Sequence, residues 1–122
     1  MKILLSIKPE FAEKIFTGEK KYEFRRSIFK NKEVKTVVVY ASYPIQKLIG
    51  EFEIENVIVD DVDSLWKRTK KFSGISKVFF FSYFLNKDKG YAIKVKNAKK
   101  YPSPRCLRET YKITPPQSFV YL

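Results

Sequence analysis

Histidine is absent from this chain of 122 residues, and cysteine occurs once, as Cys106. A single cysteine excludes an internal disulfide, and the lack of histidine excludes Cys/His zinc sites and histidine-based acid–base catalysis. Any catalysis would therefore use lysine, carboxylate, tyrosine or hydroxyl groups. Without a histidine partner, Cys106 is interpreted as a packed or incidental thiol. The sequence predicts no metal and no cofactor.

Long apolar runs are also missing. The longest runs, such as residues 78–81, are far too short to cross a bilayer, and residues 1–8 lack the layout of a signal peptide. We therefore expect a cytoplasmic protein without membrane contact. With 44% hydrophobic and 16% aromatic residues, the chain is predicted to form one domain over residues 1–122 around one core, and its oligomeric state is left open.

Acidic residues are scarce in the second half of the chain. Residues 1–60 carry 11 Lys/Arg and 9 Asp/Glu, a net of +2, whereas residues 61–122 carry 14 and 4, a net of +10. Such a one-sided excess favours a polyanionic partner, chiefly nucleic acid, over the alternative of a generally lysine-rich, soluble protein. The candidates for phosphate contacts are Lys67, Lys70, Lys71, Lys94 and Lys96.

The first 26 residues carry clear local signals. The apolar run 2–7 predicts a strand, Pro9 suits the first position of a helix, and Gly18 suits the residue just past its end. The alternation in residues 21–26 then predicts a second strand. Tyr22 and Phe24 lie on one face of that strand, and Glu23 and Arg25 lie on the other.

The remaining elements are expected at residues 34–40, 48–59 and 91–95 for strands, and at 65–72 and 77–85 for helices. Ser76 is the expected cap of the second of these helices. The aromatic stripe that follows it is interpreted as core rather than as a platform for stacking bases. The last twenty residues are expected to be an extended wrap with a short helix near Leu107.

Four segments together resemble the ASCH domain family over nearly the whole chain. They are residues 5–12 (LSIKPEFA), the spacing Gly18-x-Lys20-x-x-Glu23-x-Arg25, residues 40–44 (YASYP) and residues 115–119 (PPQSF). The ASCH family belongs to the PUA-like superfamily, whose members build a small twisted β-barrel and mostly handle RNA or modified bases. The resemblance therefore implies an α+β fold, a PUA-like small β-barrel with flanking helices.

The resemblance also implies a ligand pocket at this charged strand, where the alternative is a solvated face with exposed ion pairs. In such a pocket Glu23 would accept hydrogen bonds from base N–H groups, and Lys20 and Arg25 would engage a phosphate or a base carbonyl. Lys8 precedes a helix N-terminus that favours anions, although an ordinary loop lysine fits equally well. Two further candidates are Ser42, whose hydroxyl also suits a turn or cap bond, and Gln117, which lines the pocket or satisfies buried backbone.

Three functions remain open at this point. The first is binding of RNA or a modified nucleobase, in RNA metabolism or transcription regulation. The second is a small hydrolase or ribonuclease acting on the same ligands, with Lys20 and Glu23 as its catalytic pair. Some ASCH-like proteins hydrolyse the amide of N4-acetylcytidine and others are linked to RNA cleavage, but the former have a threonine where this chain has Glu23, so we expect binding without efficient turnover. The third is a protein-interaction module.

Overall fold

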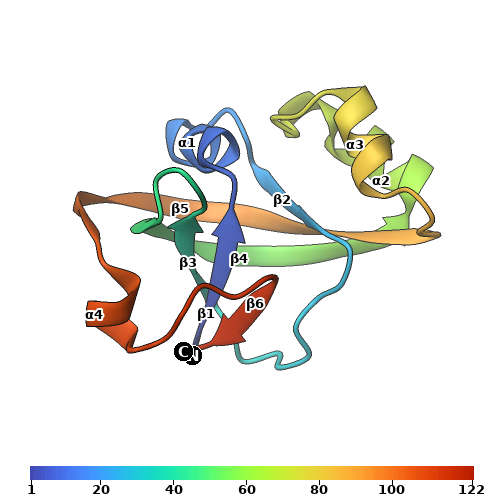
Figure 1. Cartoon of the computed structure of the whole chain (residues 1–122). Coiled ribbons are helices and arrows are strands. Elements are labelled where there is room, and N and C mark those ends of the chain that lie inside the picture. The colour runs from blue at the N-terminus through green and yellow to red at the C-terminus, as the bar shows by residue number, and fades with distance from the viewer.

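The computed structural model describes residues 1–122 and places six strands in one curled sheet (Figure 1). The order across the sheet is β2-β5-β4-β3-β1-β6, with β1 and β3 parallel and every other neighbouring pair antiparallel. The predicted α+β class is confirmed. The strands are β1 (Lys2–Ile7), β2 (Tyr22–Arg25), β3 (Thr36–Ala41), β4 (Lys47–Asp61), β5 (Lys89–Arg105) and β6 (Phe119–Tyr121).

The helices begin and end at recognisable capping residues. Gly18 ends α1 in the left-handed conformation, Asp61 accepts a hydrogen bond from Ser64 N at the start of α2, and Ser76 accepts one from Phe79 N at the start of α3. Because Asp61 is the cap, α2 begins three residues earlier than predicted. The helices are α1 (Pro9–Thr17), α2 (Val62–Thr69), the 3-10 turn η1 (Lys70–Phe72), α3 (Lys77–Tyr83) and α4 (Leu107–Tyr111).

Helices cover the sheet at separate places (Figure 1). In that view α1 lies over one end of the long β4–β5 pair, α2 and α3 lie together over the other end, and the two chain termini meet beside β1 and β6. The largest core cluster joins β1 and β3 to α1. A second cluster joins Phe24 of β2 to Leu65, Phe80 and Phe84 of the helical pair. Phe24 thus packs β2 against α2 and α3.

The expected ends of the fifth strand are wrong. Instead of stopping at Val95, β5 continues to Arg105. The extended wrap that was expected over the last twenty residues therefore begins as part of this strand. The 15-residue β4 provides a long partner for it. Pro102 and Pro104 are tolerated because the register shifts between Leu48 and Gly50, which leaves these prolines outside the regular ladder. The short helix near Leu107 is present as α4.

Pairing of β4 with β5 also changes the meaning of the charge asymmetry. The acidic residues Glu51 and Glu53 lie opposite Lys99 and Lys96. Lys94 Nζ forms an ion pair with Glu55 at 2.9 Å, and Lys100 forms one with Glu13 of α1 at 2.8 Å. Carboxylates of residues 1–60 therefore neutralise part of the excess positive charge of residues 61–122. By contrast, no ion pair involves the three helical candidates Lys67, Lys70 and Lys71.

Candidate nucleic-acid binding site

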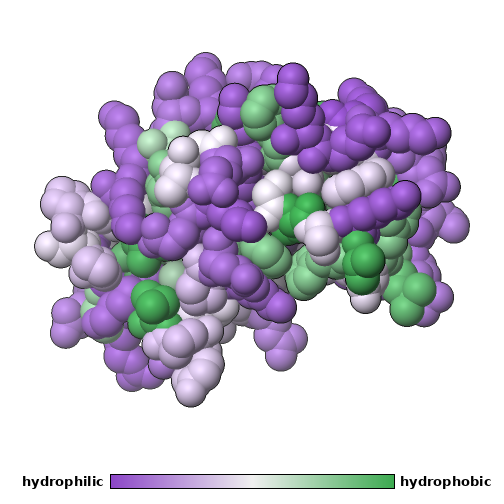
Figure 2. All heavy atoms as spheres, turned by 90° about the horizontal axis from the view of Figure 1, so that it is seen from above, coloured by the Kyte–Doolittle hydropathy of each residue, from purple (hydrophilic) through white to green (hydrophobic).

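A cavity of about 290 Å³ lies among the start of α1, strand β2 and helix α3. This volume is near the lower end of the ~300–1,000 Å³ typical of small-molecule sites, which suits a ligand about as large as one nucleoside. Seen from above, the surface over these helices is largely hydrophilic, with apolar atoms exposed near its centre (Figure 2). The lining residues are Ser6, Ile7, Lys8, Phe11, Lys20, Glu23, Phe24, Arg25, Ile75, Phe79, Tyr83 and Gln117.

Five of the candidates from the sequence line this one cavity, namely Lys8, Lys20, Glu23, Arg25 and Gln117. Ser42 does not. It lies in the turn between β3 and β4, where its N–H donates to Ile7 O at 3.0 Å and its carbonyl accepts from Ile45 N at 3.1 Å. The five basic candidates on α2, η1 and β5 also lie outside the lining: Lys67, Lys70, Lys71, Lys94 and Lys96.

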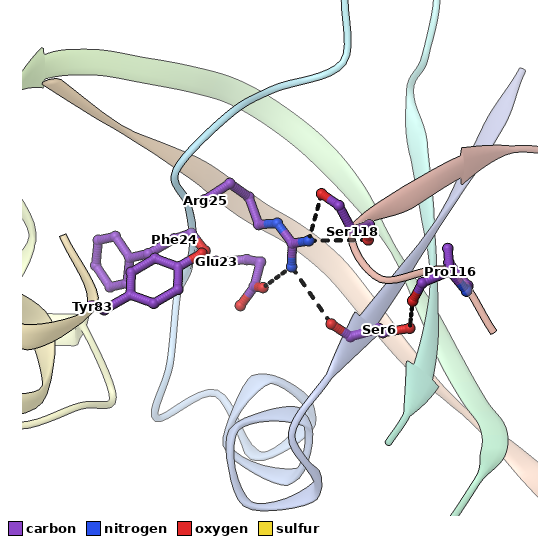
Figure 3. Close-up of polar contacts among 7 residues, drawn as sticks. All are labelled: Ser6, Glu23, Phe24, Arg25, Tyr83, Pro116 and Ser118. Carbon is purple, nitrogen blue, oxygen red and sulfur yellow. Dashed lines mark hydrogen bonds and ion pairs between the residues drawn. The ribbon is translucent and has the colours of Figure 1, made fainter. Parts of the chain in front are cut away.

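Glu23 is held in place by Arg25 (Figure 3). The Glu23 carboxylate is almost fully buried, and its Oε2 accepts a hydrogen bond from Arg25 Nη1 at 3.2 Å. The same guanidinium donates to Ser6 O at 3.5 Å and to Ser118 O and Oγ at 3.0 and 3.2 Å. Arg25 therefore ties β2 to β1 and to the segment before β6, across the open side of the sheet. The donors of Arg25 are directed mainly at protein acceptors. The second oxygen of Glu23, Oε1, has no protein partner.

The segment before β6 is also held by β1. Ser6 Oγ donates to Pro116 O at 2.9 Å, next to the Arg25 contact with Ser118 (Figure 3). These side-chain bonds place residues 116–118 beside the cavity, and Gln117 lies between the two held residues. The hydrogen bonds to Pro116 and Ser118 therefore bring Gln117 to the cavity.

Lys20 is 2% exposed, which is unusual for a lysine. Its Nζ donates to Ser73 O at 2.8 Å and lies 4.6 Å from the Phe24 ring centroid and 5.6 Å from that of Phe11. Burial lowers the pKa of Lys20 from 10.5 to about 8, although the nearby Glu23 carboxylate acts in the opposite direction. The ammonium retains two N–H groups beyond the Ser73 bond, so it can still donate to a ligand.

Helix α3 forms an aromatic wall of the cavity. Phe79 and Tyr83 are one turn apart, with ring centroids 6.5 Å apart and planes 11° from parallel. Lys8 Nζ lies 5.2 Å from the Phe79 centroid. Tyr83 OH donates to Phe24 O at 3.1 Å, and burial raises the pKa of Tyr83, so its phenol stays protonated. The wall presents apolar ring surface to a ligand.

The sequence interpretation missed this wall because it assigned the whole stripe to the core. Phe80 and Phe84 are indeed core residues, but Phe79 and Tyr83 lie at one edge of the same apolar stripe of α3 and line the cavity. Because positions i, i+1, i+4 and i+5 form one continuous helical face, no local pattern showed which edge of the stripe would line a cavity. The other lining residues for which no ligand role was predicted are Ser6, Ile7, Phe11, Phe24 and Ile75.

Comparison with known proteins agrees with this geometry. An ASCH domain family model matches residues 5–106. The crystal structure of ASCH from Zymomonas mobilis superposes with a TM-score of 0.91 at 30% identity, covering 99% of this chain and 87% of that one. An ASCH domain-containing ribonuclease of Zymomonas mobilis is 33% identical over 89 residues, which are 73% of this chain and 60% of that protein.

The chain belongs to the ASCH family, which confirms the resemblance and the fold that it implied. It is also 36% identical over 121 residues to a large ribosomal subunit protein uL22 of Ureaplasma parvum. That match covers 98% of this chain but 39% of the relative, so the chain spans well under half of that relative's length. None of the helices has the length and apolar character needed to span a membrane.

Proposed function

We propose that this chain binds single-stranded RNA and takes one unstacked base, or one modified nucleobase, into the cavity described above. The arrangement of Glu23 and Lys20 carries this proposal. An acceptor and a cationic donor meet in a largely apolar cavity of about 290 Å³. Unstacked bases are recognised through the hydrogen-bonding groups on their edges and through stacking on aromatic side chains.

Each lining group has a definite role in this proposal. Glu23 Oε1 accepts from a base N–H, Lys20 donates to a base carbonyl or phosphate, and Phe79 packs against the ring. Arg25 holds the Glu23 carboxylate rather than contacting the ligand, since its own donors are engaged by protein. Lys8, near the start of α1 and the Phe79 ring, attracts the phosphate that enters with the base.

The basic residues outside the cavity contribute affinity without selecting a base. Lys67, Lys70 and Lys71 suit this role best because no carboxylate pairs with them, whereas Lys94 is engaged by Glu55. We further propose that residues 1–122 act as one domain in the cytoplasm, where single-stranded RNA is accessible. Ser42, whose N–H donates to the lining residue Ile7, is retained as a candidate contact for a ligand that extends beyond the cavity.

A second function, hydrolysis of RNA or of a modified nucleoside, is favoured by one observation. The lowered pKa of Lys20, about 8, brings this amine near the range in which it can exchange a proton at neutral pH. Glu23 would be the second member of the catalytic pair. A relative named as a ribonuclease supports the same possibility. Binding remains the first proposal because no hydroxyl stands at position 23.

Titration with a fluorescein-labelled single-stranded RNA at several salt concentrations tests the binding proposal. We expect Phe79→Ala to weaken affinity by about fivefold at every salt concentration, since base–aromatic stacking contributes upward of ~1 kcal/mol and is not ionic. The double variant Lys70→Ala/Lys71→Ala should instead make the slope of log affinity against log salt less negative by about 1.4, which is ~0.7 for each phosphate contact that is lost.

Val78→Ala is the matched control, because Val78 lies on the same helix but is 82% exposed and outside the cavity. It should leave both affinity and salt dependence unchanged. Absence of RNA binding by the wild-type chain would contradict the proposed function. Equal losses of RNA affinity in the Phe79 and Val78 variants would contradict the proposal that the base packs against Phe79.

A further inference from the structure

The turn formed by residues 73–75 lies directly on Lys20. Gly74 has a φ of +69°, and a Cβ added there would lie 2.5 Å from Lys20 Cβ, 2.7 Å from its Cγ and 3.0 Å from its Cδ. One residue earlier, Ser73 O accepts the hydrogen bond from Lys20 Nζ at 2.8 Å. The turn therefore covers both the aliphatic stem and the charged end of this lysine. Only a glycine permits so close an approach.

The same turn is fixed by its own hydrogen bonds. The Ser73 hydroxyl, in a residue that is 3% exposed, lies 3.0 Å from Ile75 O and 3.3 Å from Lys70 O, and these two carbonyls share its single hydrogen. From α1, Lys14 Nζ donates to Gly74 O at 3.2 Å. On the other side, Lys21 N donates to Phe72 O at 2.9 Å. The position of the turn over Lys20 is thus determined from three directions.

We propose that residues 73–75 are a seal that positions Lys20 and keeps water from its ammonium, which makes Gly74 a positioning residue of the binding site. Ser73 and Gly74 act through Lys20 and do not line the cavity, whereas Ile75, the third residue of the turn, does line it. The seal rests on the proposed RNA-binding function in one respect, which is that Lys20 takes part in ligand recognition. The covering of Lys20 by the turn is independent of what enters the cavity.

The electrostatic consequence follows from the groups around Lys20. Glu23 on β2 stabilises the ammonium, whereas Lys14 on α1 opposes it, and Lys8 and Arg25 line the same cavity. Loss of hydration outweighs the effect of Glu23, so the pKa of Lys20 is lowered to about 8. An opened seal would readmit water and move the pKa back toward 10.5. The turn therefore sets how readily Lys20 releases its proton.

Gly74→Ala tests the seal directly. The chemical shift of the Lys20 Cε carbon, assigned by its absence in Lys20→Met, is followed by NMR from about pH 6 to about pH 10.5. The added methyl group must push the turn and the lysine stem apart, so we expect the pKa of Lys20 to rise by about one unit or more. Affinity for the labelled single-stranded RNA is measured in the same variants.

Gly18→Ala is the matched control. Gly18 also has a positive φ, +88°, so alanine causes comparable backbone strain there, but its Cβ would meet no atom within 4 Å. The pKa of Lys20 should not change in this variant. Equal pKa values in the Gly74 and Gly18 variants would overturn the seal.

Ser73→Ala keeps the proposal testable if Gly74→Ala fails to fold. It removes the hydroxyl bonds that fix the turn but keeps the carbonyl that accepts from Lys20, so a smaller rise in the same direction is expected. An unchanged pKa in Ser73→Ala would then reject the seal. Failure of the wild type to bind RNA would reject the proposed function alone, because the NMR comparison does not depend on RNA.

Discussion

Glu23→Gln is expected to weaken binding of single-stranded RNA by about 10- to 100-fold, which corresponds to a charge-assisted hydrogen bond of ~1.5–3 kcal/mol. The reason lies in the contact with Arg25. Because Arg25 Nη1 donates to Oε2, the carbonyl oxygen of a glutamine would take that position. The amide NH2 would then face the cavity and present donors where the ligand requires an acceptor.

The same variant separates a binding protein from an enzyme. Wild type and Glu23→Gln are incubated with N4-acetylcytidine and with single-stranded RNA, product is followed by chromatography, and affinity is measured in parallel. A catalytic pair of Lys20 and Glu23 would contribute about 10²–10⁴-fold to the rate. Product formation by the wild type that disappears in the variant while affinity stays intact would replace the binding proposal with the hydrolase.

Glu55→Gln provides the control for this comparison. Glu55 is also a strand carboxylate paired with a cation, Lys94, but its pair is exposed and it does not line the cavity. Exposed pairs contribute only ~0–1 kcal/mol, so the fold should not change measurably. Affinity should not fall, because the variant frees Lys94 for a phosphate. A loss as large as that of Glu23→Gln would indicate a general charge effect rather than recognition in the cavity.

The elements that sequence predicted best are those with local causes. The first strand, the first helix and its end at Gly18 follow from an apolar run, a proline and a glycine whose effects act within a few residues. The face of β2 that carries Glu23 and Arg25 follows from simple alternation. These features also position half of the cavity, which includes the four candidates Lys8, Lys20, Glu23 and Arg25, whereas Gln117 followed from the family resemblance.

The remaining features depend on contacts between distant segments. Ser118 reaches Arg25 from 93 residues away, and Ser73 reaches Lys20 from 53 residues away. The helix expected at residues 65–72 does end before Ser73, but no local pattern shows that the turn after it covers a lysine. Likewise, the charge excess of the second half is reduced by carboxylates on β4, and this depends on the pairing and register of two strands.

Lys20→Met is expected to abolish a pH dependence of stability that the wild type shows. Below about pH 8, Lys20 is protonated in both the folded and the unfolded chain, and the folded chain bears the full cost of a dehydrated ammonium. A difference between 10.5 and about 8 in pKa corresponds to roughly 3 kcal/mol. Methionine has similar length and no charge, so this cost is absent in the variant.

The sign follows from proton binding. Between about pH 8 and pH 10.5 the unfolded chain still holds the Lys20 proton while the folded chain releases it, so the free energy of unfolding rises with pH. Above the unfolded pKa both states are neutral and the contribution stays constant. Between pH 7 and pH 9.5 the gain of the wild type over Lys20→Met should reach about 2 kcal/mol.

Urea unfolding of both proteins at a series of pH values measures this difference. Tyr83 and Tyr101, whose pKa values are raised mainly by burial, destabilise the folded chain at higher pH, but they are present in both proteins and cancel in the comparison. Loss of the donor to Ser73 O lowers the stability of the variant by about 1–3 kcal/mol at every pH, which shifts the difference without giving it a slope. A difference that stays constant from pH 7 to pH 9.5 would mean that Lys20 is hydrated in the folded chain. Both the lowered pKa and the seal formed by residues 73–75 would then be wrong, because each requires an ammonium removed from water.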